Sequence, residues 1–175
     1  MALTLNARKG TDTLKRLEAA VTRRHAEALS LAPTEPLGAI YLFGYTIEIR
    51  LKCAYYRLVG IPLNHNLNAA LPGNIDSPFK LASMEIKRLL GPTAPNTVGH
   101  HLPGWGSLVI AARAGSPLGS FDVPFRKALL LHTKNVFLCW SEILRYRANK
   151  PYDKESEAVA DAAQWLRKNY RRLWS

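Results

Sequence analysis

The sequence contains no long uninterrupted hydrophobic run. Its longest apolar stretch, residues 37–47, is followed at once by Glu48, Arg50 and Lys52, whereas a membrane-spanning helix needs about 20 predominantly apolar residues. The first ten residues also lack the apolar segment of a secretory signal. We therefore expect a soluble, cytoplasmic protein that has no membrane among its partners.

Residues typical of disulfide frameworks and metal sites are also scarce. The two cysteines, Cys53 and Cys139, lie in apolar helical stretches, so we expect reduced thiols in the core. The five histidines form no HxxxH or HExxH pattern, and no CxxC occurs. The motifs GxxxxGK[ST], GxGxxG and GxSxG are absent as well. The sequence therefore predicts no metal site and no cofactor.

Acidic residues are few relative to basic ones. Thirteen Asp and Glu residues oppose 24 Lys and Arg residues, which gives a net charge of +11. Such an excess favours a polyanionic partner, either RNA or a nucleotide. The alternative explanation is that basic side chains complement the dipoles at helix C-termini and keep the protein soluble.

The remaining composition predicts one helical domain that spans residues 1–175. Apolar residues make up 47% of the chain, enough to build the core of a domain of this length. They recur at three- and four-residue steps without a strand-like alternation, and proline and glycine separate the periodic stretches. We predict an all-α fold, an antiparallel up-and-down bundle of four main helices plus short extra helices. The main helices are expected over residues 11–31, 35–59, 122–147 and 154–174, a short helix over 78–90, and a single helical turn within 106–113.

Tyr45, Glu48 and Lys52 are spaced three and four residues apart, so they share one face of the second predicted helix. A carboxylate in so apolar a helix must be paired or protonated. Lys52 is one available partner, but an arginine suits a carboxylate better, and we predict a structural pair of Glu48 with Arg145. The alternative is that Glu48 is an active-site or ligand-binding carboxylate.

Two further groups of residues can carry chemistry. Arg145 lies between Trp140 and Tyr146 near the end of a predicted helix, where its guanidinium can reach a carboxylate or a phosphate. His100 and His101 lie in the glycine- and proline-rich segment 91–119, and loops of such length are often functional. Adjacent histidines do not readily face the same way, so we expect at most one of the two to act.

Three motifs, in this order, resemble those of the HEPN family, whose members are helical bundles. The family motif AGYxxExxLKxxL is matched by residues 43–52, a Gly-His-Asp/Asn-Leu segment by residues 99–102, and a Trp-x(n)-Arg-Tyr segment by residues 140–146. The resemblance covers roughly residues 10–172.

This resemblance implies a homodimer and, for many members, a metal-independent ribonuclease, with toxins among them. The family's active site is an R-x(4–6)-H motif whose arginine and histidine pair across the dimer interface. Here no histidine follows Arg145 or Arg147. Tyr152 lies five positions after Arg147, but tyrosine, with a usual pKa of about 10, is a poor general base at neutral pH.

We therefore predict a HEPN-like, non-catalytic module that binds RNA or a nucleotide within a toxin–antitoxin or defence system, with a nucleotidyltransferase or an antitoxin as a further candidate partner. The residues expected to contact phosphate are Lys52, Arg145, Arg147, Lys150 and Tyr152. One alternative is a metal-independent endoribonuclease of altered active site, in which Arg145 and His100 or His101 act with Glu48 as catalytic residues. Another is a structural or antitoxin-like partner in a protein–protein complex.

Overall fold

The computed structural model describes residues 12–96, 98–140 and 151–175, and the regular secondary structure of this part of the chain is helical, with no strand. The α-helices are α1 (Leu14–Leu31), α2 (Pro36–Leu58), α3 (Pro78–Leu90), α4 (Leu102–Ala114), α5 (Val123–Cys139) and α6 (Asp153–Asn169). Two short 3-10 helices, η2 (Gly91–Thr93) and η4 (Arg171–Leu173), follow α3 and α6. The all-α class predicted from the sequence is confirmed.

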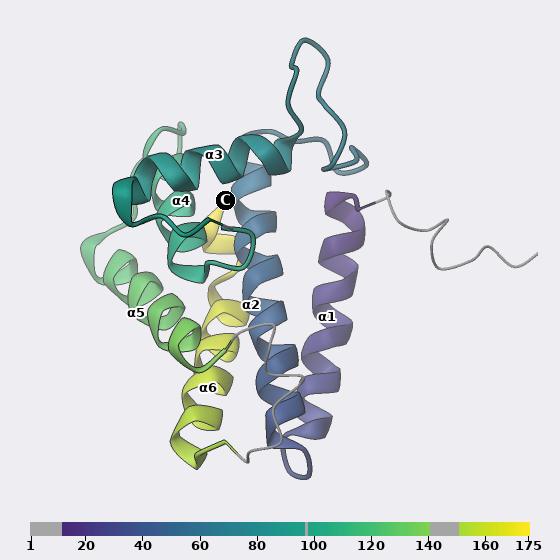
Figure 1. Cartoon of the computed structure of the whole chain (residues 1–175), viewed down its shortest axis with the longest axis vertical. Coiled ribbons are helices and arrows are strands. Elements are labelled where there is room, and N and C mark those ends of the chain that lie inside the picture. The colour runs from purple at the N-terminus through teal and green to yellow at the C-terminus, as the bar shows by residue number, and fades with distance from the viewer. Residues whose placement is uncertain (1–11, 97, 141–150) are drawn as a thin grey trace, which may run out of the picture.

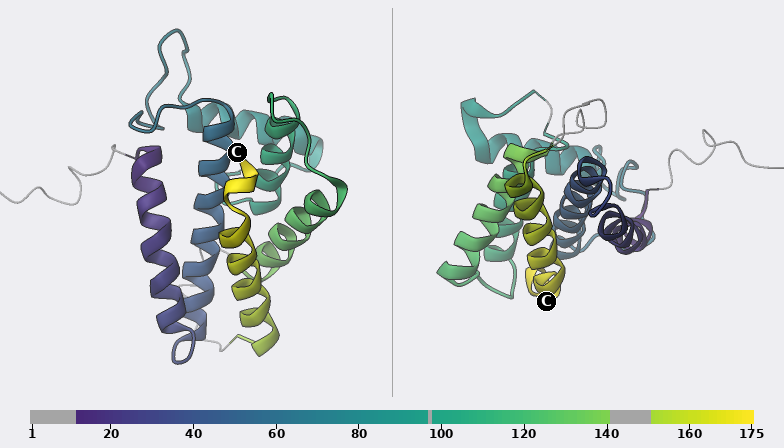
Figure 2. Two further views of the ribbon diagram at one scale, coloured as in Figure 1. Left: turned by 180° about the vertical axis from the view of Figure 1, so that it is seen from behind. Right: turned by 90° about the horizontal axis from the view of Figure 1, so that it is seen from below.

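Helix α2 occupies the centre of the fold. α1 and α2 run antiparallel and are joined by a short turn, while α6 runs in the same direction as α2 (Figure 1). α2 packs against both α1 and α6, and the three helices lie side by side in the view from behind (Figure 2). On its other side α2 packs against α4, which also contacts α3 and α5. The predicted four-helix up-and-down arrangement is not confirmed, because α4 is a full helix in the middle of this packing.

The sequence explains why α2 is central and where it ends. Pro36 stands in its first turn, where a missing backbone N–H is tolerated. Buried side chains such as Phe43, Ile47 and Tyr56 lie on more than one of its faces. Gly60, with a φ of +76°, turns the chain away in a conformation that other residues rarely adopt.

The prediction for α4 was too short, because its glycines and proline are not loop residues. The segment predicted as one turn within 106–113 is a helix of 13 residues. Gly104 lies so close to α3 that a Cβ there would approach Ile86 Cγ2 to 2.6 Å, and a Cβ at Gly106 would lie 3.1 Å from Thr133 Oγ1 of α5. The two glycines thus allow close helix packing, which a local reading of composition cannot reveal.

The C-terminal boundaries also differ from the predicted ones. The helix predicted over residues 122–147 begins at Val123 and ends at Cys139, and residues 141–150 lie outside the described part of the chain. The helix predicted over residues 154–174 ends at Asn169 and is followed by η4.

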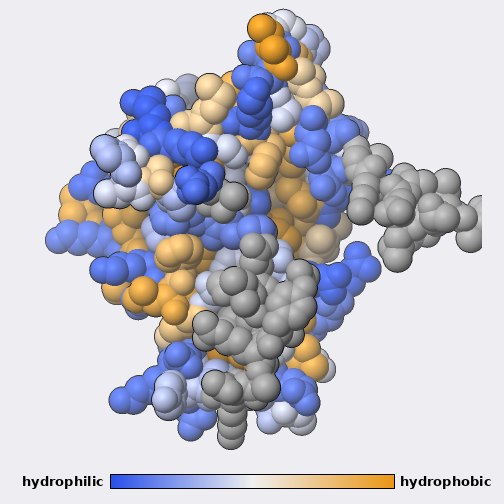
Figure 3. Space-filling model, in the orientation of Figure 1, coloured by the Kyte–Doolittle hydropathy of each residue, from blue (hydrophilic) through white to orange (hydrophobic). Residues whose placement is uncertain are grey.

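Within the described ranges, no helix is long and apolar enough to cross a membrane. On the face shown in Figure 3, hydrophilic side chains are interspersed with hydrophobic ones, and hydrophobic atoms are visible where α5 lies. The exposed apolar side chains of α5 are Val123, Leu130, Leu131, Phe137 and Leu138.

Candidate functional site

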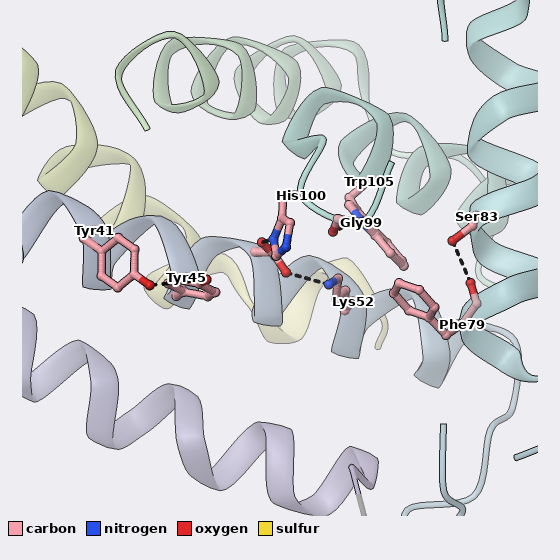
Figure 4. Close-up of polar contacts among 9 residues, drawn as sticks. Tyr41, Tyr45, Lys52, Phe79, Ser83, Gly99, His100 and Trp105 are labelled. Atoms are coloured by element: carbon pink, nitrogen blue, oxygen red, sulfur yellow. Dashed lines mark hydrogen bonds and ion pairs between the residues drawn. The ribbon is translucent and has the colours of Figure 1, made fainter. Parts of the chain in front are cut away.

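The carboxylate of Glu48 is the polar centre of the fold. Only 3% of the residue is exposed, and each of its two carboxylate oxygens accepts a hydrogen bond. Oε1 accepts a hydrogen bond from Lys52 Nζ at 2.5 Å, and Oε2 accepts one from His100 Nδ1 at 2.7 Å. Figure 4 shows the His100 ring over α2 and, further along the helix, Lys52 with the dashed line that marks its hydrogen bond. These two donors offset the cost of burying the charge. We call Tyr45, Glu48, Lys52, His100 and Trp140 the Glu48 cluster.

Lys52 is enclosed rather than directed to solvent. Its side chain is 13% exposed, and its ammonium lies 5.4 Å from the ring centre of Phe79 and 5.3 Å from that of Trp105. Contact with two aromatic faces and a carboxylate satisfies the charge. An ammonium held in this way favours a structural role over the predicted contact with phosphate.

The adjacent histidines face different surroundings. The ring of His100 is held by Glu48 and lies edge-on to the rings of Tyr45 and Trp140, while 42% of its side chain remains exposed. His101 instead caps α4, because its Nδ1 accepts a hydrogen bond from Gly104 N at 3.0 Å. Burial lowers the pKa of His101, which keeps that nitrogen available as an acceptor. Of the two, His100 alone belongs to the Glu48 cluster.

Trp140 fixes the end of α5 to the first half of α2. Its ring is buried, its Nε1 donates a hydrogen bond to the carbonyl of Tyr41 at 3.0 Å, and it makes a T-shaped contact with the Tyr45 ring, with centres 5.4 Å apart. The close approach is possible because residue 44 is glycine. Two of the motifs quoted from the sequence therefore meet in space.

Several predicted site residues lie outside the described part of the chain. They are Arg145, Arg147 and Lys150, and with Arg145 the predicted pair with Glu48 falls outside it too. Tyr152 is described: it is the N-cap residue of α6, its side chain is exposed, and its backbone N–H donates to Glu155 Oε2. Its ring is thus available on the surface.

The Glu48 cluster borders a cavity of about 340 Å³. Tyr45, Glu48 and Lys52 line it from α2, and Phe79 and Asn68 line it from the segments opposite. His100 does not line this cavity but borders another, of about 400 Å³, together with Phe79 and Lys87. An imidazole oriented by a buried carboxylate is suited to proton transfer or to donating a hydrogen bond to a ligand. No group of three or more His, Cys, Asp or Glu side chains that could hold a metal ion occurs among the residues described.

The contact between Glu48 and His100 was not predicted. The two residues are 52 positions apart, and the histidine pair offered no pattern that names its partner. The one available signal was the requirement that a carboxylate in an apolar helix must find a donor.

No family model matches the chain, and no curated protein or solved structure is significantly similar to it. Its function must therefore be inferred from its own residues.

Proposed function

We propose that this protein is a HEPN-like module that binds RNA or a nucleotide. The observation that carries the proposal is a positive charge that the protein itself does not neutralise. The net charge is +11, and many described basic side chains have no carboxylate within ion-pair distance. The exposed ones on the α-helices are Lys15, Arg23, Lys87, Arg126, Lys127, Lys134, Lys154, Arg167 and Lys168. A polyanion supplies the missing counter-charge.

Helix α5 is the best candidate for the contact with phosphates. It carries Arg126, Lys127 and Lys134 and contains no acidic residue. All three side chains come from one rigid helix, so they present a fixed spacing of charge to a nucleic-acid backbone.

The test is a titration of labelled single-stranded RNA with the protein at increasing salt. Log affinity should fall linearly with log salt, by about 0.7 for each phosphate neutralised. Replacing Arg126, Lys127 and Lys134 together by glutamine should weaken binding and reduce that slope by about 2. Affinity that is absent at low salt, or unchanged as salt rises, would refute the proposal.

A matched control removes the same charge elsewhere. Arg24, Lys80 and Arg88 are exposed and each is paired with a carboxylate three or four residues away. Their combined replacement by glutamine should leave the salt slope nearly unchanged. An equal loss in both triple variants would show that net charge, and not α5, governs the binding.

The hydrogen bond between Glu48 and His100 favours a second candidate, a metal-independent endoribonuclease. A carboxylate-held imidazole can accept the proton of a ribose 2′-hydroxyl as that oxygen attacks the adjacent phosphate, whose bond to the 5′-oxygen of the next nucleotide breaks. The 5′-oxygen leaves and takes up a proton. This candidate predicts RNA cleavage in EDTA that is lost in Glu48→Gln, His100→Ala and Arg145→Ala. His101→Asn is the matched control, because asparagine keeps the helix cap and removes only an imidazole outside the cluster. If RNA is bound but not cleaved, the binding module remains and the ribonuclease is excluded. Cleavage that survives all three substitutions would point to a contaminating nuclease.

The exposed apolar face of α5 supports assembly as a homodimer. Leu130 and Phe137 are seven residues apart, as are Leu131 and Leu138, so they form a stripe along the helix. Lys127 and Lys134 share this face, so a dimer formed through it competes with the contact to phosphate. Light scattering after gel filtration should give twice the chain mass for the wild type and the chain mass for a Leu131→Glu, Leu138→Glu variant. The control is Ile75→Glu on an exposed loop. A monomeric wild type would instead favour a different protein, such as a nucleotidyltransferase or an antitoxin, on this face.

A further inference from the structure

A second cavity, of about 450 Å³, lies on another face of α2. Thr22 lines it from α1, Arg50 and Cys53 from α2, and Tyr170 and Trp174 from the C-terminal turn. These three segments lie side by side in the view from behind (Figure 2). Because Arg50 follows Glu48 by two residues, the two side chains leave α2 about 200° apart. The cavity is thus separate from the Glu48 cluster.

Arg50 is the feature of this cavity that needs an explanation. Only 9% of the residue is exposed, and its Nε is buried without a hydrogen-bond partner in the part of the chain that the structure describes. Its guanidinium lies 5.3 Å from the ring centre of Tyr170, and no carboxylate of the described residues lies within ion-pair distance. An arginine does not lose its proton in a protein. A buried charge of this kind is costly unless something pairs with it.

The acidic side chain in the lining, Glu18, is already occupied. Its two oxygens accept hydrogen bonds from Arg57 Nε at 2.6 Å and from an Arg57 terminal nitrogen at 2.7 Å. Oε1 also accepts one from the Tyr170 hydroxyl at 2.9 Å. These contacts hold the pKa of Glu18 below its usual value. Glu18 therefore builds the wall of the cavity and leaves the charge of Arg50 unbalanced.

A second unsatisfied donor belongs to the same cavity. Trp174 Nε1 is buried and has no hydrogen-bond partner within residues 12–96, 98–140 and 151–175. Its ring is covered by the guanidinium of Arg57, 4.3 Å from the ring centre, so the indole is fixed in place. Arg50 and Trp174 both lack an acceptor, and neither can supply one to the other. What the cavity lacks is an acceptor-rich, negatively charged group.

We propose that this cavity binds a small molecule bearing an oxyanion, a phosphate monoester or a carboxylate, through Arg50. The forked donors of a guanidinium match the oxygens of either group. A volume of about 450 Å³ lies within the range of small-molecule sites. The proposal goes beyond the RNA-binding function and does not depend on it, since it uses none of the basic residues of α5.

The experiment is isothermal titration calorimetry of the full chain with four probes: AMP, adenosine, inorganic phosphate and benzoate. AMP or benzoate should bind, and adenosine, which lacks the oxyanion, should not. Binding of AMP and phosphate without benzoate identifies a phosphate site, and the reverse identifies a carboxylate site. Arg50→Met should weaken the binding of the oxyanion by about tenfold or more. Arg88→Met, which removes one exposed charge outside the cavity and outside α5, should leave it unchanged.

Thr22 offers a variant that does not remove the buried arginine. Thr22→Glu places a carboxylate on the rim of the cavity, where it should pair with Arg50, abolish oxyanion binding and raise the melting temperature. Thr22→Gln, its uncharged counterpart, should retain binding. The proposal is overturned if no oxyanion binds the wild type, or if Arg88→Met weakens binding as much as Arg50→Met. It is also overturned if Thr22→Glu binds as the wild type does. RNA titration of the same variants separates this outcome from a failure of the RNA-binding proposal.

Discussion

The indole of Trp140 rests directly against the backbone of Gly44, and a methyl group at residue 44 would overlap the ring. The two residues lie 96 positions apart, on α2 and at the end of α5. Trp140 Nε1 is bound to the Tyr41 carbonyl, so the indole has little freedom to move aside. The glycine in the GYxxExxLK motif is thus required by the tryptophan of a later motif.

Gly44→Ala is therefore expected to lower the free energy of unfolding by about 3 kcal/mol, since overpacking a well-filled core forces side chains or backbone to shift. Urea unfolding followed by circular dichroism measures the change. Gly38→Ala is the control in the same helix, because its Cβ would lie 3.6 Å from the nearest side-chain atom. There alanine should raise stability by about 0.5–1 kcal/mol through its helix propensity. Equal effects at the two positions would contradict the packing argument.

Removing the buried carboxylate should be much more costly than removing an exposed one. Glu48→Ala leaves the enclosed ammonium of Lys52 without its counter-ion, and we expect a loss of about 3–5 kcal/mol of unfolding free energy. Glu27→Ala breaks the exposed pair with Arg24 and should cost less than about 1 kcal/mol. Chemical denaturation of both variants compares them directly. A small loss for Glu48→Ala would mean that Lys52 reaches solvent when its partner is removed.

The cap of α4 should distinguish alanine from asparagine at position 101. His101→Ala removes the acceptor of the Gly104 N–H and should destabilise the protein by about 1 kcal/mol, whereas His101→Asn can replace that acceptor. Thermal unfolding at neutral pH is a sufficient measurement. If both variants lose the same stability, the packing of the imidazole on Phe137, and not the cap, is what position 101 contributes.

Acid should destabilise the protein through its buried histidines. Burial, followed by the charges of Arg50 and Arg167, lowers the pKa of His25 below its usual 6.5, and neither ring nitrogen has a hydrogen-bond partner among the described residues. The unfolded chain then binds the proton more readily than the folded one does. The stability due to the neutral ring is therefore present above pH 6.5 and is lost as the pH falls through the lower, folded-state pKa.

His25→Leu is the variant that tests this linkage. Leucine fills a similar apolar space and cannot be protonated, so the unfolding free energy of the variant should fall less than that of the wild type as the pH is lowered from 7 toward about 5. Part of the dependence should remain, because burial also lowers the pKa of His101 and His132. Parallel pH profiles for variant and wild type would show that His25 does not contribute.

The sequence predicted the helices that carry strong periodicity and clear stop signals. The helix predicted over residues 35–59 is α2, with a proline at its start and Gly60 after its end, and α3 spans the predicted residues 78–90. The sequence predicts only one turn in the place of α4, because Pro103, Gly104 and Gly106 are weak helix formers. Their roles are set by Ile86 and Thr133, which approach from other helices. Tertiary packing overrode the local preference there.

The candidate site was predictable only in part, for a similar reason. The spacing of Glu48 and Lys52 follows from helix geometry, and their hydrogen bond is present. The choice of His100 as the second donor depends on how residues 98–101 cross α2, which no spacing in the sequence encodes. The burial of Arg50 was even harder to predict, since an arginine in a helix normally lies on the surface.

The reaction rate of the Cys53 thiol can serve as a measure of local opening in this fold. Its thiol is buried beside Arg50, and burial raises its pKa to about 12, so almost none of it is thiolate at neutral pH. A thiol reagent can modify Cys53 only when α1, α2 and α6 part, whereas the half-buried Cys139 is more accessible. The rate of Cys53 modification thus reports how often these helices separate, and an occupant of the cavity would slow it without any engineered label.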